Sequence, residues 1–526
     1  MNEAGKWIGF AAGKKKTQIK EAVMKIYKSS ELEGAALSQE QSLWIYNGMD
    51  TAITFEVHSA LQRQINQEPF AYKMSRAMQG PAFTLSTRGV RIDGVARAKA
   101  LQSLEADKAA FERIFGRLTG EALGVPINYR SPPQLKKLFF ELLGLKPITK
   151  YDRATKSQVV TTGREALEKL CKDPKGRLFA ELVLALRDID KKRQVLMVGI
   201  DGGRMYASYH VAGTVTGRWA SSSDVFGRGT NLQNITDKLR RIFIADPGKK
   251  LAYVDLQQAE SMIVAMICLR WGHGYWDAVK SGDVHTFVTK SVWPTELPWT
   301  GDPCKDKELA DETKFYQERS FRDMGKRGGH ASNYGVTPTM LALNLKIPLA
   351  VAQGFADRYY AAFPEIKQWH NHVRQQLAAT RSITTSFGRT CHFPGRPWES
   401  DTIKSAIAYE PQSTIGDLLN LGFYRVWRKY DRIFDPNRYV EFLLQVHDAV
   451  VFQYPAEVEQ EIVPQVLRDL IVPIQINGQE CRVGCDAMVG FNWGKAGPDN
   501  PLGLKKFVAG VPDDRKAPST LARLLG

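Results

Sequence analysis

The chain has 526 residues, with 72 Lys and Arg against 56 Asp and Glu, and a formal net charge of +16 at pH 7. A chain of this length is too long to form one compact core, so two or more domains are expected. The surplus of basic residues favours a polyanionic partner such as nucleic acid. The six cysteines lack disulfide-framework spacing and no run of about eighteen apolar residues occurs, which argues against a secreted scaffold or a membrane protein and predicts a soluble, cytoplasmic one.

The first 200 residues are predicted to be mainly helical. Residues 1–80 form an N-terminal segment of mixed composition, in which Ser38 is placed to cap a helix that carries Tyr46 and Asp50. From residue 91 to about 200, apolar residues recur at helical spacing with many charges between them. This pattern predicts a basic, helical lobe.

Strand patterns begin near residue 205 and lead to the first candidate catalytic residue. Residues 205–260 contain alternating apolar residues among many Gly and Ser. Within residues 251–256, this alternation places Asp255 at the end of a strand, on the face that points away from the core. The strand runs directly into a helix-like segment that carries Glu260.

Residues 262–380 return to helical spacing, with a surface loop rich in Pro, Asp and Lys expected at 293–313. One helix of this region carries four polar or aromatic residues at successive i, i+4 positions: Arg322, Lys326, His330 and Tyr334. Arg offers a bidentate fork and Lys a point charge, a combination suited to a triphosphate. Because many surface helices carry an Arg and a Lys four residues apart, an ordinary solvent-facing helix is the alternative.

The C-terminal part is predicted to alternate between strands and helices. Strands or hairpins are expected at 382–393, 440–454 and 475–489, with helices at about 400–428 and 457–470. After Trp493 the chain is rich in Gly, Pro and Lys, so residues 496–526 are expected to form a flexible tail. Cys481 and Cys485 form one pair without a second pair or a His nearby, which predicts buried thiols and no zinc.

The run Gln445-Val446-His447-Asp448-Ala449 stands between two apolar stretches and predicts a β-hairpin with a carboxylate at its tip. If this hairpin packs beside the strand of Asp255, the two carboxylates repel one another, and divalent cations relieve that repulsion. Mg²⁺ is the expected ion because it prefers oxygen ligands, and two ions about 3.5–4 Å apart can clamp a phosphoryl displacement. Two unrelated turn aspartates are the alternative.

Taken in order, these motifs resemble those of family A DNA polymerases, the DNA polymerase I family, and most of all its phage-encoded members. Residues 255–260, 322–335 and 445–448 are similar to motifs A, B and C of that family. The likeness extends over about residues 80–495. Further stretches that agree are Ser131-Pro-Pro-Gln-Leu135, Thr216-Gly-Arg218, Asn231-Leu-Gln-Asn234, Asp283-Val-His285-Thr286, Phe387-Gly-Arg389, Gln412-Ser-Thr414 and Gly490-Phe-Asn-Trp493.

The resemblance implies an α/β right-hand fold, of the α+β type, with an antiparallel palm sheet and helical fingers and thumb. The implied activity is template-directed DNA synthesis with two Mg²⁺ ions, which extends a primer from deoxynucleoside triphosphates, in the host cytoplasm if the chain is phage-encoded. The implied division is an N-terminal segment at 1–80, the thumb at 81–204, the palm at 205–269 and 376–495, the fingers at 270–375, and the tail at 496–526.

The resemblance also assigns roles to single residues. Asp255 and Asp448 would be catalytic and would bind both metal ions, with the backbone carbonyl of Leu256 as an added ligand. Nucleotide binding would fall to Arg322, Lys326, His330 and Tyr334, and to Glu260 as a steric gate against a ribose 2′-hydroxyl. Primer and template would be contacted in the minor groove, whose acceptors are common to all base pairs, by Arg218, Asn231, Gln233, Gln412, Gln445 and His447.

Three positions depart from the family pattern. Motif C usually ends in Glu, where this chain has Ala449, and an aromatic residue usually follows the motif A aspartate, where it has Leu256. A Phe or Tyr usually stacks on the nucleotide at the position of His330, which predicts altered discrimination of sugar-modified nucleotides. Gly325, Gly328 and Gly329 cost the same helix about 1 kcal/mol each relative to Ala and predict a pliable segment.

Tyr46 and Asp50 resemble the last motif of the family's 3′ to 5′ exonuclease, so residues 1–80 are interpreted as at most a remnant of that domain, with an ordinary helix as the alternative. We therefore expect no proofreading by this chain alone, and a separate exonuclease subunit or a processivity factor as a partner. Two other functions stay open. One is a single-subunit RNA polymerase, which shares the hand, and the other is a catalytically silent primer-template binding subunit, which Ala449 suggests.

Overall fold

The computed structural model describes residues 38–64, 70–121, 123–152, 155, 157–224, 227–431, 439–511, 513 and 515. The chain divides into two compact units, residues 1–73 and 74–526. Helix α3 (Gln39–Gln64) belongs to the first unit and begins directly after Ser38, so the predicted helix that carries Tyr46 and Asp50 is confirmed. Among the described residues, no helix is both long and apolar enough to cross a bilayer.

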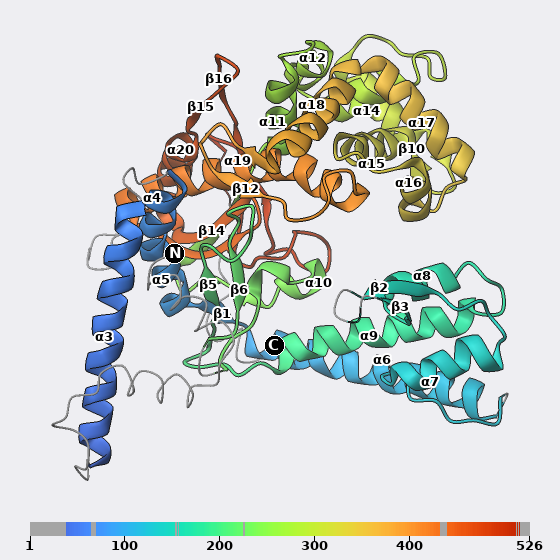
Figure 1. The fold of residues 1–526 in the computed structure, drawn as a ribbon, viewed down its shortest axis with the longest axis horizontal. Coiled ribbons are helices and arrows are strands. Elements are labelled where there is room, and N and C mark those ends of the chain that lie inside the picture. The colour runs from blue at the N-terminus through green and yellow to red at the C-terminus, as the bar shows by residue number, and fades with distance from the viewer. Residues whose placement is uncertain are drawn as a thin grey trace. The chain divides into compact units, whose positions relative to one another are not determined.

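The second unit starts with α4 (Phe70–Ala77), which spans the boundary, α5 (Gln79–Arg88) and a short strand β1 (Val90–Ile92). A helical lobe follows, in which α6 (Gly94–Gly120) and α9 (Arg177–Met197) pack side by side (Figure 1). Its smaller elements are α7 (Pro132–Lys136), the π-helix η1 (Lys137–Leu142), the hairpin of β2 (Thr149–Asp152) and β3 (Ser157–Val160), and α8 (Arg164–Leu170).

The lobe is held by an apolar core of its own. The side chains of α9 that recur at helical spacing are buried, among them Val183 and Leu186, and they pack with Leu135, Phe139 and Leu167 from the smaller helices. Asp93 begins α6 by accepting a hydrogen bond from the backbone amide of Ala96, which is the usual role of an Asp at a helix start. The predicted helical lobe is therefore confirmed, with the β2–β3 hairpin as an addition.

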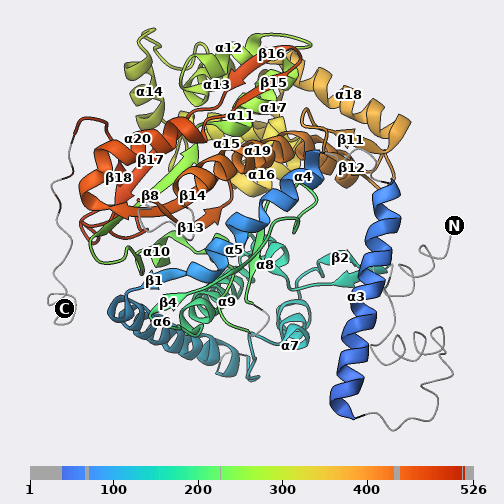
Figure 2. The same cartoon turned by 90° about the vertical axis from the view of Figure 1, so that its left-hand side faces the viewer.

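In the described part of the chain, five antiparallel strands form the central sheet, in the order β13-β14-β8-β17-β18 (Figure 2). Strand β8, the predicted strand before Asp255, lies in the middle. Its apolar residues Leu251, Ala252 and Val254, which alternate between the two faces of the sheet, are all buried, so both faces are covered at β8. The strands are β8 (Lys249–Leu256), β13 (Glu441–Val446), β14 (Ala449–Pro455), β17 (Cys485–Gly490) and β18 (Lys505–Lys506).

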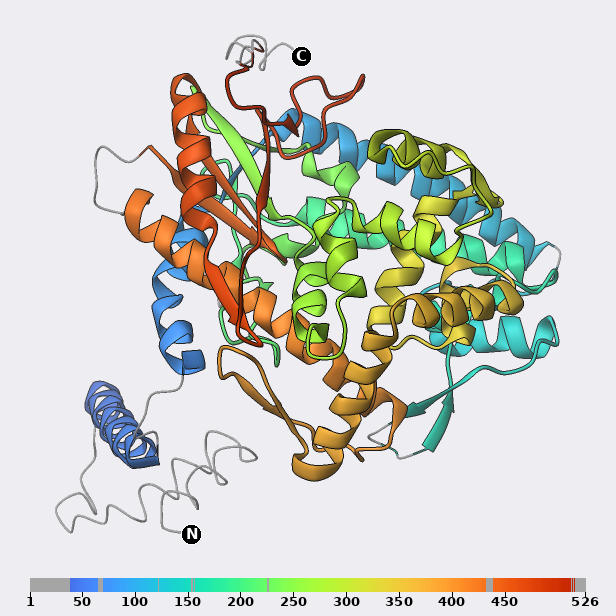
Figure 3. The same ribbon diagram turned by 90° about the horizontal axis from the view of Figure 1, so that it is seen from above.

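Three helices cover this sheet or its neighbours. Helix α20 (Glu459–Leu470) packs on β14 and β17, the long helix α19 (Ser400–Tyr430) packs on α20, and α11 (Ala259–Cys268) packs on α19 (Figure 3). Both predicted helices near 400–428 and 457–470 are thus confirmed. Helix α11 begins at the end of β8, so the chain passes from the strand that carries Asp255 directly into the helix that carries Glu260.

Short strands and turns complete this part of the fold. One sheet has the order β4-β1-β7, and the other pairs are hairpins or two-stranded sheets. These elements are η2 (Leu232–Asn234), α10 (Asp237–Arg240), η3 (Ala456–Val458), β4 (Arg204–Met205), β5 (Ser208–His210), β6 (Ala220–Ser222), β7 (Phe243–Ile244), β11 (Ser382–Thr384), β12 (Thr390–His392), β15 (Pro473–Ile476) and β16 (Gln479–Arg482).

A second helical lobe lies between the two parts of the sheet in sequence. It contains α12 (Gly274–Lys280), α13 (Val284–Val292), α14 (Pro303–Glu312), α15 (Phe321–Asn333), α16 (Pro338–Leu345), α17 (Leu349–Ala362) and α18 (Pro364–Thr380), with the short strands β9 (Lys314–Tyr316) and β10 (Arg319–Ser320). Helix α15 carries the predicted i, i+4 series and packs on α13 and α17.

Two local predictions were wrong. The segment 293–313, expected as a loop, contains α14, because Asp302 caps the amides of Cys304 and Lys305 and Pro303 fits the first helical turn. In the tail, Lys505–Lys506 forms the edge strand β18, so the expected flexible tail was wrong for the described residues 496–511, 513 and 515; residues 512, 514 and 516–526 lie outside the described part. Asp513 holds the tail further along, since its buried carboxylate pairs with Lys250 of β8 at 2.8 Å.

The glycines of α15 have a packing role that the sequence did not reveal. A Cβ added to Gly325 would overlap Thr289 of α13, and one added to Gly328 would overlap the ring of Phe355 of α17. At Gly329 the nearest side-chain atom, Cγ1 of Val288, would be 3.4 Å away. Two of the three glycines therefore let α15 approach its neighbours closely.

This contrast predicts opposite results for two alanine variants of α15. Gly328→Ala should destabilise the protein by about 1–3 kcal/mol, because Phe355 must move to make room. Gly329→Ala should be neutral or stabilising by up to about 1 kcal/mol, since Ala favours the helix and its Cβ meets no overlap. Urea unfolding of both variants and the wild type measures the difference. Equal free energies of unfolding for the two variants would contradict the packing role.

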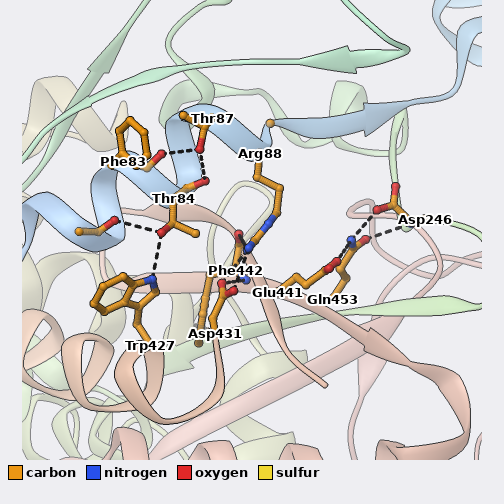
Figure 4. A network of polar contacts seen from close by, with 12 residues as sticks. Phe83, Thr84, Thr87, Arg88, Asp246, Trp427, Asp431, Glu441, Phe442 and Gln453 are labelled. Atoms are coloured by element: carbon orange, nitrogen blue, oxygen red, sulfur yellow. Dashed lines mark hydrogen bonds and ion pairs between the residues drawn. The ribbon is translucent and has the colours of Figure 1, made fainter. Parts of the chain in front are cut away.

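A polar network ties the start of the second unit to the sheet (Figure 4). Arg88, at the end of α5, donates two hydrogen bonds to the carboxylate of Asp431 at 2.6 and 2.8 Å, and a third to the carbonyl of Phe442 in β13. Asp431 also accepts from the amide of Phe442. Nearby, Gln453 of β14 donates to Glu441 at 2.6 Å. These bonds thus hold strands β13 and β14 together at the end of the hairpin opposite the turn that carries Asp448.

Glu441 gives a pH-dependent contribution to stability. Burial opposes its ionisation, but hydrogen bonds from Lys249 and Gln453 outweigh burial and lower the pKa to about 2. Because this pKa lies below that of the unfolded chain, the stabilisation is present above about pH 4.5 and is lost as the pH falls toward 2. Glu441→Gln should remove about 2 kcal/mol at pH 7 and less at pH 3, measured by urea unfolding. An equal loss at both pH values would contradict the ionic contribution.

Candidate active site

The predicted hairpin is confirmed, and its turn presents a carboxylate. Val446 pairs with Ala449, so His447 and Asp448 are the two turn residues. His447 has a φ of 54°, which lies in the left-handed region, and its carbonyl accepts a hydrogen bond from Gln445 at 2.6 Å. Gln233 of η2 in turn donates to Gln445 at 2.6 Å. The buried side-chain amides of Gln233 and Gln445 therefore fix the conformation of the turn through hydrogen bonds.

The predicted juxtaposition of the two carboxylates is also confirmed. Asp255, the last residue but one of β8, pairs with Ala449, the residue after Asp448, and the amide of Leu256 donates to the Asp448 carbonyl. Protein atoms around Asp255 and the charge of Asp448 raise the pKa of Asp255 to about 6. Burial raises the pKa of Asp448 as well. Both carboxylates are thus held where negative charge is unfavourable without a cation.

Arg218 supplies part of that positive charge. Its Nη2 atom lies 3.0 Å from Asp448 Oδ1 and 3.5 Å from Glu260 Oε1. The preceding Gly217 has a φ of +77°, and a Cβ there would lie 2.7 Å from the guanidinium carbon of Arg389. The predicted minor-groove contact of Arg218 remains a prediction, because in this structure the guanidinium lies among carboxylates.

A cavity of about 380 Å³ opens beside the carboxylates. Lys326, on the predicted face of α15, lines it and makes no ion pair with any described residue. Glu260 and His330 lie on its wall, and His330 Nδ1 is 3.2 Å from Glu260 Oε2. The ring of Tyr334 packs edge-on against His330 at 5.0 Å. The residues that line this cavity include Asp255, Leu256, Glu260, Lys326, His330 and Asp448.

Arg322 does not line this cavity. Its guanidinium forms hydrogen bonds of 3.0–3.1 Å with Asp283, and its Nη1 is 3.5 Å from Asp311 of α14. Asp283 also caps α13 by accepting from the amides of His285 and Thr286. The guanidinium of Arg322 is therefore engaged by two carboxylates that do not line the cavity.

The predicted primer and template residues fall into two groups. Asn231 and Gln233 are engaged internally, since the Asn231 carboxamide accepts from the Gln233 amide and from Ser221, and Gln233 and Gln445 are buried. His447 is exposed at the turn, and Gln412 is partly exposed on α19. Gln233, Gln445 and His447 are therefore neighbours, with His447 in the turn and the two glutamines hydrogen-bonded beneath it. Gln412 lies on a separate helix, α19.

Two polar residues near the site were not assigned a role from the sequence. His285 lines the cavity, and burial together with the charges of Lys326 and Arg322 lowers its pKa to about 4, so the imidazole is neutral at pH 7. Asp486 of β17 pairs directly opposite Asp255. An Asp inside a strand is unfavourable for β-structure, and this was the available signal for Asp486.

The carboxylates fit a hard divalent cation. Asp448 Oδ1 is buried, and although Arg218 Nη2 lies 3.0 Å away as an ion-pair partner, no described group donates a hydrogen bond to this oxygen. In that same part, no three His, Cys, Asp or Glu side chains form a preformed metal cage. Mg²⁺ does not need one, because it is commonly held by one or two carboxylates together with water and substrate phosphates.

A helical lobe, an antiparallel sheet with two carboxylates beside a cavity, and a second helical lobe that supplies a lysine to that cavity together form a right-hand fold. The family model for DNA polymerase family A matches residues 98–495, which is more than half of the chain. The chain therefore belongs to DNA polymerase family A, and the predicted family and fold class are confirmed.

Curated relatives agree with this assignment. A thermostable DNA polymerase I of Thermus filiformis is 26% identical over 429 residues, covering 76% of this chain and 46% of that protein. DNA polymerase I of Pseudomonas aeruginosa is 26% identical over 475 residues, covering 86% and 47%. The chain spans about half the length of these relatives. Nothing in these relatives bears on a phage subclass, which stays a prediction.

A solved structure has the same fold. The polymerase domain of Pol1 from M. smegmatis, in complex with DNA primer-template and dNTP, matches with a TM-score of 0.67 and 21% identity, covering 84% of this chain and 74% of that one. At this level of identity the likeness concerns the fold. The predicted antiparallel palm sheet with helical lobes is thus confirmed.

Proposed function

We propose that the chain catalyses template-directed DNA synthesis. The observation that carries the proposal is the pair of Asp255, near the end of β8, and Asp448, in the turn that leads into the adjacent strand β14, beside a cavity lined by Lys326. The primer 3′-hydroxyl oxygen attacks the α-phosphorus of a deoxynucleoside triphosphate. The bond from this phosphorus to its bridging oxygen breaks, pyrophosphate leaves with the electron pair, and the hydroxyl proton passes to solvent.

Asp255, Asp448 and the carbonyl of Leu256 would hold two Mg²⁺ ions, which lower the pKa of the attacking hydroxyl and neutralise charge on the leaving pyrophosphate. Lys326 grips the triphosphate from the cavity wall, and Arg322 joins it after leaving Asp283. The two side chains differ in what they must break first. Arg322 must leave its ion pair with Asp283, whereas Lys326 makes no ion pair with any described residue.

The remaining predicted residues select and align the substrates. Glu260, held between Arg218 and His330, occupies the space of a ribose 2′-hydroxyl, and Tyr334 closes the pocket against the template base. The residues that the sequence assigned to primer and template contact the DNA through minor-groove acceptors. These residues are Arg218, Asn231, Gln233, Gln412, Gln445 and His447. Gln233 and Gln445 would exchange their mutual hydrogen bond for bonds to DNA, at little net cost in hydrogen bonding.

Primer extension with Mg²⁺ and either deoxy- or ribonucleotides tests the function. We expect extension with deoxynucleotides and little with ribonucleotides. Extension with ribonucleotides alone would favour the single-subunit RNA polymerase. Binding of primer-template without any extension would favour the silent binding subunit.

A separate exonuclease subunit or a processivity factor is proposed as a partner. It rests on the resemblance of Tyr46 and Asp50 to the last motif of the family's exonuclease; residues 1–37 and 65–69 lie outside the described part. A pull-down followed by an exonuclease assay tests the first partner. Absence of exonuclease activity in the captured material would contradict it.

His330 should set the discrimination between deoxy- and dideoxynucleotides. Its imidazole is engaged with Glu260, so the carboxylate that faces the sugar is oriented from α15. His330→Phe removes this contact and should change the ratio of dideoxy- to deoxynucleotide incorporation at least about fivefold, which corresponds to about 1 kcal/mol. Gel assays with matched primers measure the ratio. Identical selectivity in both proteins would rule out this role.

A further inference from the structure

One row of the central sheet carries an unexplained charge. Asp255 on β8 pairs with Ala449 on one side and with Asp486 on the other. Residues directly opposite one another in antiparallel strands point to the same face, so these three side chains form a row. Like charges directly opposite are destabilising in a sheet. Asp486 therefore destabilises the fold unless a cation that binds nearby neutralises its charge.

The surroundings of Asp486 do not neutralise it. Gln257, the second residue after Asp255, donates to Asp486 Oδ1 at 2.7 Å, which orients the carboxylate without balancing its charge. The nearest described cation is Lys506 of β18, at 3.9 Å and with three quarters of its side chain exposed. Such an exposed pair contributes little, about 0–1 kcal/mol. The charge of Asp486 also adds to that of Asp448 in raising the pKa of Asp255.

The opposite neighbour of Asp255 contributes no charge at all. Ala449 is fully buried and offers only a methyl group to the row. The negative charge that faces the site thus comes from the turn through Asp448 and from the far side of β8 through Asp486. Asp255 thus has two neighbouring carboxylates, one from the turn between β13 and β14 and one from strand β17.

We propose that Asp486 is a positioning carboxylate of the cation site, which acts through water and through its charge on the cation held by Asp255 and Asp448. This inference rests on the proposed function. The absence of a preformed three-ligand cage among the described side chains agrees with an outer role. Outer partners of metal ligands typically contribute about 10- to 100-fold in metal affinity.

The test measures Mn²⁺ binding to the full chain by the loss of the free-ion signal in electron paramagnetic resonance, without DNA or nucleotide. Asp486→Asn should raise the apparent Kd of the site about 10-fold, and Asp486→Glu should stay close to the wild type. Asp448→Ala defines the background of binding elsewhere. Glu480→Gln, an exposed acid on β16, is the matched control and should bind like the wild type.

A second variant separates the proposal from a purely structural ion pair. If Asp486 only pairs with Lys506, then Lys506→Gln and Asp486→Asn should have the same effect. If Asp486 serves the cation, Lys506→Gln should leave Mn²⁺ binding unchanged or strengthen it, because a competing positive charge is removed.

The outcomes distinguish this inference from the proposed function. Wild-type protein that neither extends primers nor binds Mn²⁺ above the Asp448→Ala background would overturn both. Wild-type protein that extends primers would leave the function standing. In that case, an unchanged Kd in Asp486→Asn, or no binding above the background, overturns the role of Asp486 alone.

Discussion

Asp448→Ala should lower the rate of primer extension by at least about 1000-fold, which corresponds to about 4 kcal/mol of lost transition-state stabilisation. The carboxylate lies near Asp255 and raises its pKa, and the guanidinium of Arg218, 3.0 Å from Asp448 and 3.5 Å from Glu260, balances only part of the charge of these three acids, so a metal cation suits the site. Single-turnover extension of a labelled primer with saturating deoxynucleotide measures the rate.

The fold should tolerate this change. Removing Asp448 relieves its repulsion of Asp255, and Arg218 keeps Glu260 as an ionic partner at 3.5 Å. The thermal unfolding temperature of Asp448→Ala should therefore equal or exceed that of the wild type. Extension at the wild-type rate would refute the assignment of Asp448 to the metal site, and Glu480→Gln provides the control for removal of an unrelated carboxylate.

Asp431→Asn should destabilise the protein by about 3–5 kcal/mol, which is the usual cost of breaking a buried ion pair from one side. The carboxylate is completely buried and accepts from Arg88 and from the amide of Phe442, as Figure 4 shows. An asparagine there leaves the guanidinium without a counter-charge and replaces one acceptor oxygen with a donor. Urea unfolding with constant m-values measures the loss.

A surface pair provides the comparison for this prediction. Glu168→Gln breaks the exposed pair with Arg164, whose atoms lie 2.9 Å apart, and should cost no more than about 1 kcal/mol. Similar losses in Asp431→Asn and Glu168→Gln would show that the buried network contributes no more than a solvated one. Because β13 leads from this network to the turn of Asp448, Asp431→Asn should also reduce extension activity at temperatures near its unfolding transition.

The main elements of the site were predictable because their signals are local. Alternation in residues 251–256 and the apolar stretches around Asp448 specify strands, and a two-residue turn between strands exposes its side chains. The i, i+4 series from Arg322 to Tyr334 specifies one helical face. Each pattern needs only a few neighbouring residues to be read.

Partner choice was not predictable in the same way. Arg322 pairs with Asp283 and Asp311, and Arg218 lies between Asp448 and Glu260, although the sequence suggested phosphate and groove contacts. These pairings join residues far apart in the chain, so they depend on how helices and strands pack. The same holds for Gly325 and Gly328, whose role is set by side chains on α13 and α17.

Local sequence patterns predicted most of the strands and helices in order, Asp255 near the end of a strand, Asp448 in a hairpin turn, and the resemblance to DNA polymerase family A. The tertiary structure decided that Asp255 stands between Ala449 and Asp486, that Arg218 balances the carboxylates, and that the tail adds strand β18. The two kinds of information act over different distances along the chain. Period and propensity act over a few residues, whereas strand register, burial and ionic pairing are fixed only when distant segments pack together.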